Sequence, residues 1–375
     1  MRPFGTNWQR RNFRMIDMVQ KRSVLRYIST LCLIILVVPL LVCSGETSQD
    51  KGPAVSPRPN IILMMADDLG WGDVGYNGNE LIRTPAIDQL ARSGIRFNRF
   101  YAAAPVCSPT RFSCLTGRHP QRAGIFSANV GHLPKEELSL SEFLKEKGYA
   151  TGHFGKWHLG TLTTEEVDAN RGRPGDSSHY SPPWENGFDV SFSTESKVPT
   201  WNPMVTPSAD SGDIGRRTPG EPFGTAFWEG PGRKATENLG GDASRIIMDR
   251  VVPFIETAAD RGAPFLAVIW FHTPHLPTLT GEEYRRLYSE QSPDIQHFYG
   301  AISAMDRQIG RLRNLLRDRG IEQDTIWFFT SDNGPEGATR AGRTQGSTKG
   351  LRGRKRSLHE GGIRVPGFLY WPSGV

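Results

Sequence analysis

Three short apolar runs, each followed at once by polar residues, constrain the fold of this chain most. They cover residues 61–66, 265–271 and 325–329. The runs are too short for helices and lack the alternation of a half-buried strand, so each is typical of a strand buried on both faces of a parallel sheet. Helical periodicity lies between them, which predicts an α/β fold with a mainly parallel central sheet flanked by helices.

Apolar spacing predicts helices over residues 85–93, 138–147 and 297–319. In the last helix four arginines fall opposite the apolar face, and we expect them to be solvated: Arg311, Arg313, Arg317 and Arg319. Residues 160–240 are rich in Gly, Pro, Ser and Thr and show no strong period. We interpret them as long loops over the edge of the sheet, with a substrate-facing lid as one role.

The basic character of the chain is confined to its beginning. Residues 1–30 hold seven Lys or Arg and one acid, which accounts for the whole formal charge of +6. The remainder is neutral overall, so the charge does not indicate a nucleic-acid partner. An apolar run over residues 27–43 follows the basic stretch. We expect residues 1–45 to be a signal peptide or an N-terminal anchor, cleavage being favoured, residues 46–58 to be a linker, and the protein to be secreted or periplasmic.

The chain has few cysteines for an exported protein. Outside the N-terminal segment only Cys107 and Cys114 occur. The two could pair with each other, or both could be small buried thiols. So small a number suggests instead that at least one of them serves in chemistry.

Carboxylates follow two of the predicted strands. Asp67 and Asp68 come directly after the first run, and Asp332 and Asn333 follow the third. Ligands in parallel sheets bind at the carboxyl ends of the strands, where these side chains would meet. An Asp-Asp pair alone is most often a turn or a helix cap. The coincidence of two such strand ends favours a site for a hard cation, calcium or magnesium.

Basic and nucleophilic residues occur at comparable positions. Lys156 and His158 lie in a Gly-Lys-Trp-His-Leu-Gly segment, and His272 follows the second run, with His275 as a weaker candidate. If a helix begins near Pro109, Cys107 and Arg111 would both face its amino end, where anions are stabilised. These residues therefore indicate an anion site.

Several segments, in the same order along the chain, resemble one family. They are residues 60–70, 107–118, 155–160, 331–334 and 360–366. The segment beginning Cys107-Ser108-Pro109-Thr110-Arg111 is similar to the signature of the type I sulfatases, of the alkaline-phosphatase-like superfamily, such as arylsulfatases and N-acetylgalactosamine-6-sulfatases. The resemblance runs from Pro59 to the last residue and implies that residues 59–375 form a sulfatase catalytic domain.

The resemblance implies a role for each matched residue. Cys107 matches the cysteine that a formylglycine-generating enzyme oxidises to formylglycine. The matched ligands of a calcium ion, with magnesium as the less favoured metal, are Asp67, Asp68, Cys107, Asp332 and Asn333. Arg111 matches the residue that holds the formylglycine hydrate. Four residues match those around the sulfate: Lys156, His158, His272 and Lys355. His158 would be the base, and His272 or Lys355 the acid. Lys349 is a weaker alternative to Lys355.

The implied activity is hydrolysis of a sulfate ester of a small molecule or, more specifically, a saccharide. The alternatives are a phosphonate or phosphodiester hydrolase of the same superfamily and an inactive binding protein. We expect no nucleic-acid partner, and membrane contact only through an uncleaved N-terminal segment. Sulfatases usually continue into a smaller C-terminal antiparallel subdomain, and we expect this chain, which stops before it, to lack one.

Overall fold

The computed structural model describes residues 58–209, 214–337 and 345–375. All of them belong to one compact unit, Val55–Val375. The predicted signal or anchor over residues 1–45 lies outside the described residues, as does the predicted linker except for Arg58. Within the described part of the chain, no helix has the length and apolarity needed to cross a membrane.

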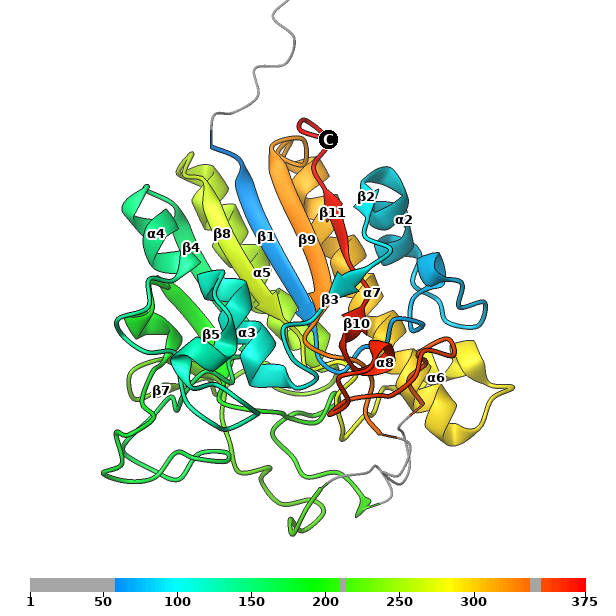
Figure 1. The fold of residues 1–375 in the computed structure, drawn as a ribbon, viewed down its shortest axis with the longest axis horizontal. Coiled ribbons are helices and arrows are strands. Elements are labelled where there is room, and N and C mark those ends of the chain that lie inside the picture. The colour runs from blue at the N-terminus through cyan, green and yellow to red at the C-terminus, as the bar shows by residue number, and fades with distance from the viewer. Residues whose placement is uncertain (1–57, 210–213, 338–344) are drawn as a thin grey trace, which may run out of the picture. The chain divides into compact units, whose positions relative to one another are not determined.

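A mostly parallel sheet forms the centre of the fold (Figure 1). Strand β1 (Asn60–Ala66) pairs in parallel with β8 (Phe265–Trp270) on one side and β9 (Thr325–Ser331) on the other. These are the three apolar runs. β4 (Ala150–Lys156) continues the parallel pairing beyond β8, and β5 (Val190–Thr194) continues it beyond β4. The predicted α/β class with a mainly parallel sheet is confirmed.

Short antiparallel strands extend both edges of this sheet. In the described residues its order is β2-β11-β9-β1-β8-β4-β5-β6-β7. The edge strands are β2 (Ile95–Arg96), β11 (Phe368–Tyr370), β6 (Trp228–Gly230) and β7 (Arg233–Lys234). A separate antiparallel pair is formed by β3 (Phe100–Tyr101) and β10 (Arg364–Val365).

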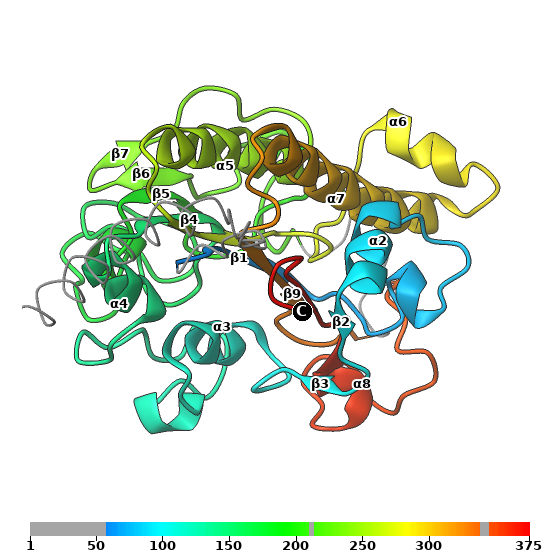
Figure 2. The same ribbon diagram turned by 90° about the horizontal axis from the view of Figure 1, so that it is seen from above.

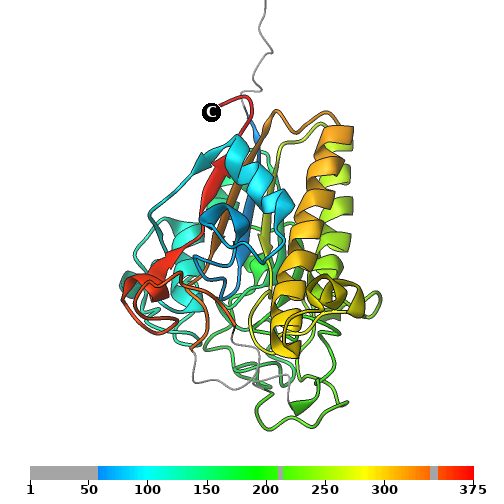
Figure 3. The same cartoon turned by 90° about the vertical axis from the view of Figure 1, so that its right-hand side faces the viewer.

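Helices cover both faces of the sheet (Figure 2). On one face lie α2 (Pro85–Ser93), α5 (Ala243–Asp260) and α7 (Pro293–Asp318), and Figure 3 shows α5 and α7 side by side as one layer. On the opposite face lie α3 (Cys107–Thr116) and α4 (Leu140–Glu146). Two apolar clusters fill the spaces between the sheet and these layers. The short helices α6 (Glu282–Arg285) and α8 (Glu360–Ile363) lie in connections.

Local capping explains where the predicted helices begin. The helix expected over 297–319 starts earlier, at Pro293, because the side chain of Ser292 accepts a hydrogen bond from the main chain of Ile295 and proline suits a first helical position. The helix expected over 138–147 is confined to α4, where Ser139 and Glu142 form a capping box. The helix expected near Pro109 begins two residues before it, at Cys107.

Two expectations are wrong in part. Residues 160–240 are not only loops, because β5 within them joins the parallel sheet and β6 and β7 extend its edge. Arg313 is not solvated: its side chain is buried, and its Nε donates a 2.7 Å hydrogen bond to Glu322. The helix face that carries Arg313 packs towards β11, where Arg313 also donates to the Tyr370 hydroxyl at 3.2 Å.

Candidate active site

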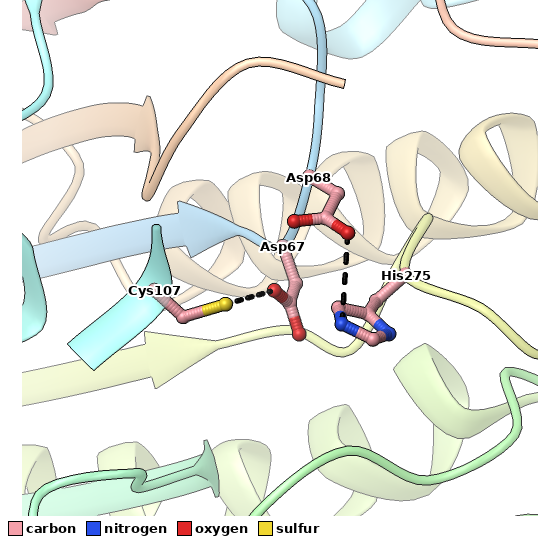
Figure 4. A group of neighbouring side chains, drawn as sticks. All are labelled: Asp67, Asp68, Cys107 and His275. Carbon is pink, nitrogen blue, oxygen red and sulfur yellow. Dashed lines mark hydrogen bonds and ion pairs between the residues drawn. The ribbon is translucent and has the colours of Figure 1, made fainter. Parts of the chain in front are cut away.

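Polar side chains from strand ends that are distant in sequence meet at one place (Figure 4). Asp67 and Asp68 follow β1, Cys107 begins α3, and His275 follows β8. One ligand atom of each of these four residues lies within 4.8 Å of the others. Cys107 Sγ is 3.7 Å from Asp67 Oδ1, and His275 Nε2 is 3.6 Å from Asp68 Oδ2. The combination of carboxylates, a thiol and an imidazole can hold a divalent cation.

The end of β9 completes this cluster. Asp332 Oδ1 accepts a 3.1 Å hydrogen bond from the main-chain nitrogen of Asp68, and Asn333 Nδ2 donates to Asp68 Oδ1 at 2.7 Å. Asn333 Oδ1 is buried and has no hydrogen-bond partner among the described residues. A buried oxygen without a partner is costly, and a bound cation would satisfy it. The donor set therefore fits a hard cation.

Buried charges of both signs surround Cys107. The charged side chains are Asp67, Asp68, Asp332, Arg111, Lys156 and Lys355. Their formal charges cancel, as buried charges require. A divalent cation would make the cluster positive, and a positive, largely dehydrated cluster favours an anionic ligand.

Each cation of the cluster has a particular carboxylate partner. Arg111 donates from Nη2 to Asp332 Oδ2 at 2.6 Å and from Nη1 to the main-chain oxygen of Lys156 at 2.9 Å. Lys156 Nζ lies 2.8 Å from Asp67 Oδ2. Lys355 Nζ lies 2.6 Å from Asp68 Oδ1. The basic residues predicted for the anion site therefore contact the carboxylates predicted for the metal site.

Burial and neighbouring charges give the acidic groups of this cluster very different pKa values. Burial, helped by the charge of Asp332, raises the pKa of Asp67 to about 7 against the opposing effects of Lys156 and Arg111. Burial also acts to raise the pKa of Asp332, but Arg111, Lys156 and Lys355 hold it at about 2. Burial raises the pKa of the Cys107 thiol to about 12. An unmodified Cys107 is thus protonated at neutral pH and a poor nucleophile.

A cavity of about 310 Å³, here called the inner cavity, opens beside this cluster. Of the predicted site residues, those that line it are Cys107, Lys156, His158 and Lys355. The other predicted residues are buried behind this lining: Asp67, Asp68, Arg111, His272, Asp332 and Asn333. A larger cavity of about 790 Å³ between α2, α6 and α7 has none of the predicted residues in its wall.

His158 is held by a hydrogen-bonded network of asparagines. Its Nε2 lies 2.9 Å from Asn129 Oδ1, which also accepts a 3.1 Å hydrogen bond from Asn170 Nδ2. Because Asn129 presents its oxygen, Nε2 of His158 carries the proton and Nδ1 is the free base. His158 Nδ1 is buried and has no partner in the described part of the chain. Burial, with the charges of Lys156 and Arg111, holds the pKa of His158 well below its usual value.

His272 occupies a different place. Its ring is fully buried, and Nε2 lies 3.3 Å from the hydroxyl oxygen of Thr194 at the end of β5. It does not line the inner cavity. Burial and the charge of Lys156 hold its pKa well below the usual value.

Sequence reasoning missed several residues of the inner cavity. They are Asn129, Asn170, Ser196, Lys197, Glu336 and Arg356. Most of them lie in connections without an apolar period, so no local signal marked them. His275, considered a weaker candidate, lies in the cluster with Asp68. Lys349, the alternative to Lys355, is exposed and bonds instead to the main-chain oxygen of Gly78 at 2.7 Å.

Comparison with known proteins gives one consistent result. The family model for sulfatases matches residues 59–375. The chain is 33% identical to mouse (Mus musculus) arylsulfatase G over 87% of this chain and 62% of that protein. It is 31% identical to mouse N-acetylgalactosamine-6-sulfatase over 84% of this chain and 58% of that protein. The chain thus spans about three fifths of the length of these curated relatives.

A solved structure supports the same comparison. The crystal structure of Ps i-CgsB in complex with k-i-k-neocarrahexaose superposes with a TM-score of 0.70 at 29% identity. The match covers 85% of this chain and 67% of that one.

Proposed function

The chain belongs to the sulfatase family, and we propose that it hydrolyses sulfate esters at the inner cavity. One observation carries this proposal: Cys107 lies at the wall of the cavity, against a buried cluster of three carboxyl groups and three cations whose formal charges cancel. Such a cluster becomes an anion site when a divalent cation binds. A sulfate ester is an anion that repels nucleophiles, so a positive site both binds it and stabilises the charge that builds up during transfer.

We propose that Asp67, Asp68, Asp332 and Asn333, together with residue 107, hold calcium. The two carboxylates after β1, Asp332 and Asn333 offer oxygen donors, as calcium prefers, and Asn333 Oδ1 has no other partner among the described residues. The ion would supply positive charge next to residue 107. His275 Nε2 lies 3.6 Å from Asp68 Oδ2, so this imidazole would help to orient the Asp68 carboxylate.

Residue 107 would act as formylglycine, made from Cys107 by a formylglycine-generating enzyme, and its hydrated aldehyde would supply the attacking hydroxyl. The high pKa of the unmodified thiol supports a need for modification. Lys156 and Lys355 line the cavity beside residue 107 and would bind the sulfate oxygens, and Arg111 would orient residue 107 from behind. His158 Nδ1 would accept a proton, and Lys355 would donate one to the leaving alcohol, with His272 as the less direct alternative.

We propose that the substrate is a sulfated saccharide. The names of the mouse N-acetylgalactosamine-6-sulfatase and of the saccharide complex of Ps i-CgsB support this class. The N-terminal layout leads us to propose export to the periplasm or the exterior, with a retained anchor as the alternative.

The test begins with the peptide that contains residue 107. After co-expression with a formylglycine-generating enzyme, its mass should show conversion of Cys107 but not of Cys114. The protein should hydrolyse 4-nitrophenyl sulfate faster than 4-nitrophenyl phosphate, and Cys107→Ala should abolish this activity while Cys114→Ala retains it. An unmodified Cys107, full activity of Cys107→Ala, or faster turnover of the phosphate would each overturn the proposal.

A further inference from the structure

A second cavity of about 450 Å³, here called the outer cavity, adjoins the inner one. The two share three lining residues, Val106, Ser127 and Arg356. Val106 immediately precedes Cys107 and is the N-cap residue of α3. A ligand whose sulfate reaches Cys107 can therefore extend past this boundary into the outer cavity.

The outer cavity has large apolar side chains in its wall that are open to solvent. Phe126 is 62% exposed and Leu358 is 78% exposed. Single exposed apolar residues are ordinary, but here two come from distant parts of the chain and line one cavity. The same wall also holds polar groups, His119 and Gln121. A pyranose ring matches such a wall because it has an apolar C–H face and a polar hydroxyl edge.

Arg356 is held in place at the boundary by two contacts. Its main-chain nitrogen donates to Pro105 at 2.8 Å, which ties the 351–358 loop to the segment before α3. Its guanidinium is paired with Glu336. Its φ of +73° is unusual for a residue other than glycine. Strain of this kind persists where the surrounding structure imposes it, often at ligand sites. The side chain, half exposed, can donate to a substrate that spans the boundary.

We propose that the outer cavity binds a second sugar ring, so that the substrate is a sulfated oligosaccharide of at least two rings. This inference rests on the proposed sulfatase activity and deepens it. The inner cavity alone is near the lower limit of ligand pockets, roughly 300–1,000 Å³, whereas the two cavities together fall well within that range. The inner cavity then holds the ring that carries the sulfate, and Phe126 and Leu358 contact the next ring.

The test compares substrates that differ in length. The rate constant kcat/KM is measured for 4-nitrophenyl sulfate and for a panel of singly sulfated galactose and N-acetylgalactosamine saccharides, each as a monosaccharide and as the matching disaccharide. The native protein should prefer a disaccharide to its monosaccharide. Phe126→Ala should lower that preference about tenfold, the equivalent of about 1.4 kcal/mol, mainly through KM. Leu358→Ala should act in the same direction.

Phe143→Ala is the matched control, because Phe143 is 44% exposed on α4 and lines neither cavity. It should leave the preference unchanged. If 4-nitrophenyl sulfate is hydrolysed but no disaccharide is preferred, or if Phe126→Ala and Leu358→Ala retain the preference, the outer cavity is not a sugar site. Absence of turnover of every sulfate ester would instead refute the proposed function on which this inference rests.

Discussion

The ammonium group of Lys355 lies 2.6 Å from Oδ1 and 2.7 Å from Oδ2 of Asp68, a residue 287 positions earlier in the chain. Both side chains are buried. Burial raises the pKa of Asp68, and Lys355 opposes that effect. The segment after β9 thus supplies the counter-charge for the buried carboxyl group at the end of β1.

Removing this ammonium should destabilise the protein strongly. Lys355→Met leaves Asp68 without its counter-charge, and loss of one partner of a buried pair costs about 3 kcal/mol or more. We expect a loss of that size in urea unfolding without added divalent cations. Lys349→Met, at an exposed position, should change stability by less than about 0.5 kcal/mol. Asp68→Asn combined with Lys355→Met should recover part of the loss, and equal effects of the two lysine variants would contradict the assignment.

Calcium should stabilise the folded protein through the acidic cluster. A ligand that binds only the folded state at a hundred times its dissociation constant adds about 2.7 kcal/mol. We expect calcium to raise Tm, magnesium to raise it less, and a chelator to reverse the rise. Asp332→Asn should remove the calcium effect, whereas Asp176→Asn, an exposed carboxylate outside the cluster, should keep it. A calcium-dependent Tm unaffected by Asp332→Asn would place the metal elsewhere.

The contact between Asn129 and His158 should set the pH dependence of activity. In Asn129→Asp a carboxylate would replace the amide oxygen that lies 2.9 Å from His158 Nε2. A nearby opposite charge raises the pKa of a histidine by about 1 unit or more. A base must be neutral to act, so the acidic limb of kcat/KM against pH should move to higher pH by about that amount. Asn98→Asp, at an exposed position away from the cavity, should leave the limb in place. An unmoved limb in Asn129→Asp would exclude His158 as the base.

Glu336 should make stability fall at acidic pH. Burial acts to raise its pKa, but hydrogen bonds from Arg356 and the charge of Lys355 lower it from 4.5 to about 2. A depressed carboxyl pKa stabilises the fold above pH 4.5, and this contribution is lost as the pH falls from 4.5 towards 2. Native protein should therefore exceed Glu336→Gln in unfolding free energy at pH 6, by up to about 3 kcal/mol. The difference should shrink by pH 3, and a constant difference across that range would show that the charge of Glu336 is not responsible.

Some strands could be predicted and others could not, for a physical reason. β1, β8 and β9 are apolar on both faces and therefore stand out as continuous runs. β4 and β5 also belong to the parallel part of the sheet, but they bury polar groups, which break such a run. His153 Nδ1 and Ser193 Oγ, for example, satisfy each other across these strands at 2.7 Å. This hydrogen bond forms only after the two strands are adjacent, so no local sequence pattern predicts it.

The buried Arg313 illustrates the same limit. Its position opposite the apolar stripe of α7 predicted solvent exposure. Burial depends on Glu322 and Tyr370, which come from later segments and accept hydrogen bonds from Nε and Nη2 of Arg313. A helix period records which face is apolar, but it carries no information about a distant partner for a charge.

The amino-acid sequence by itself determined the chemistry available to this protein. Cys107, the carboxylates after β1 and β9, and the lysines are visible because strand ends and short motifs are local features. Tertiary structure alone decided how these groups are arranged. It paired Lys355 with Asp68, placed His158 at the inner cavity and His272 behind it, and set Arg356 between two cavities. Each of these arrangements joins segments far apart along the chain, and only the packing of the sheet and its connections determines which side chains come within reach.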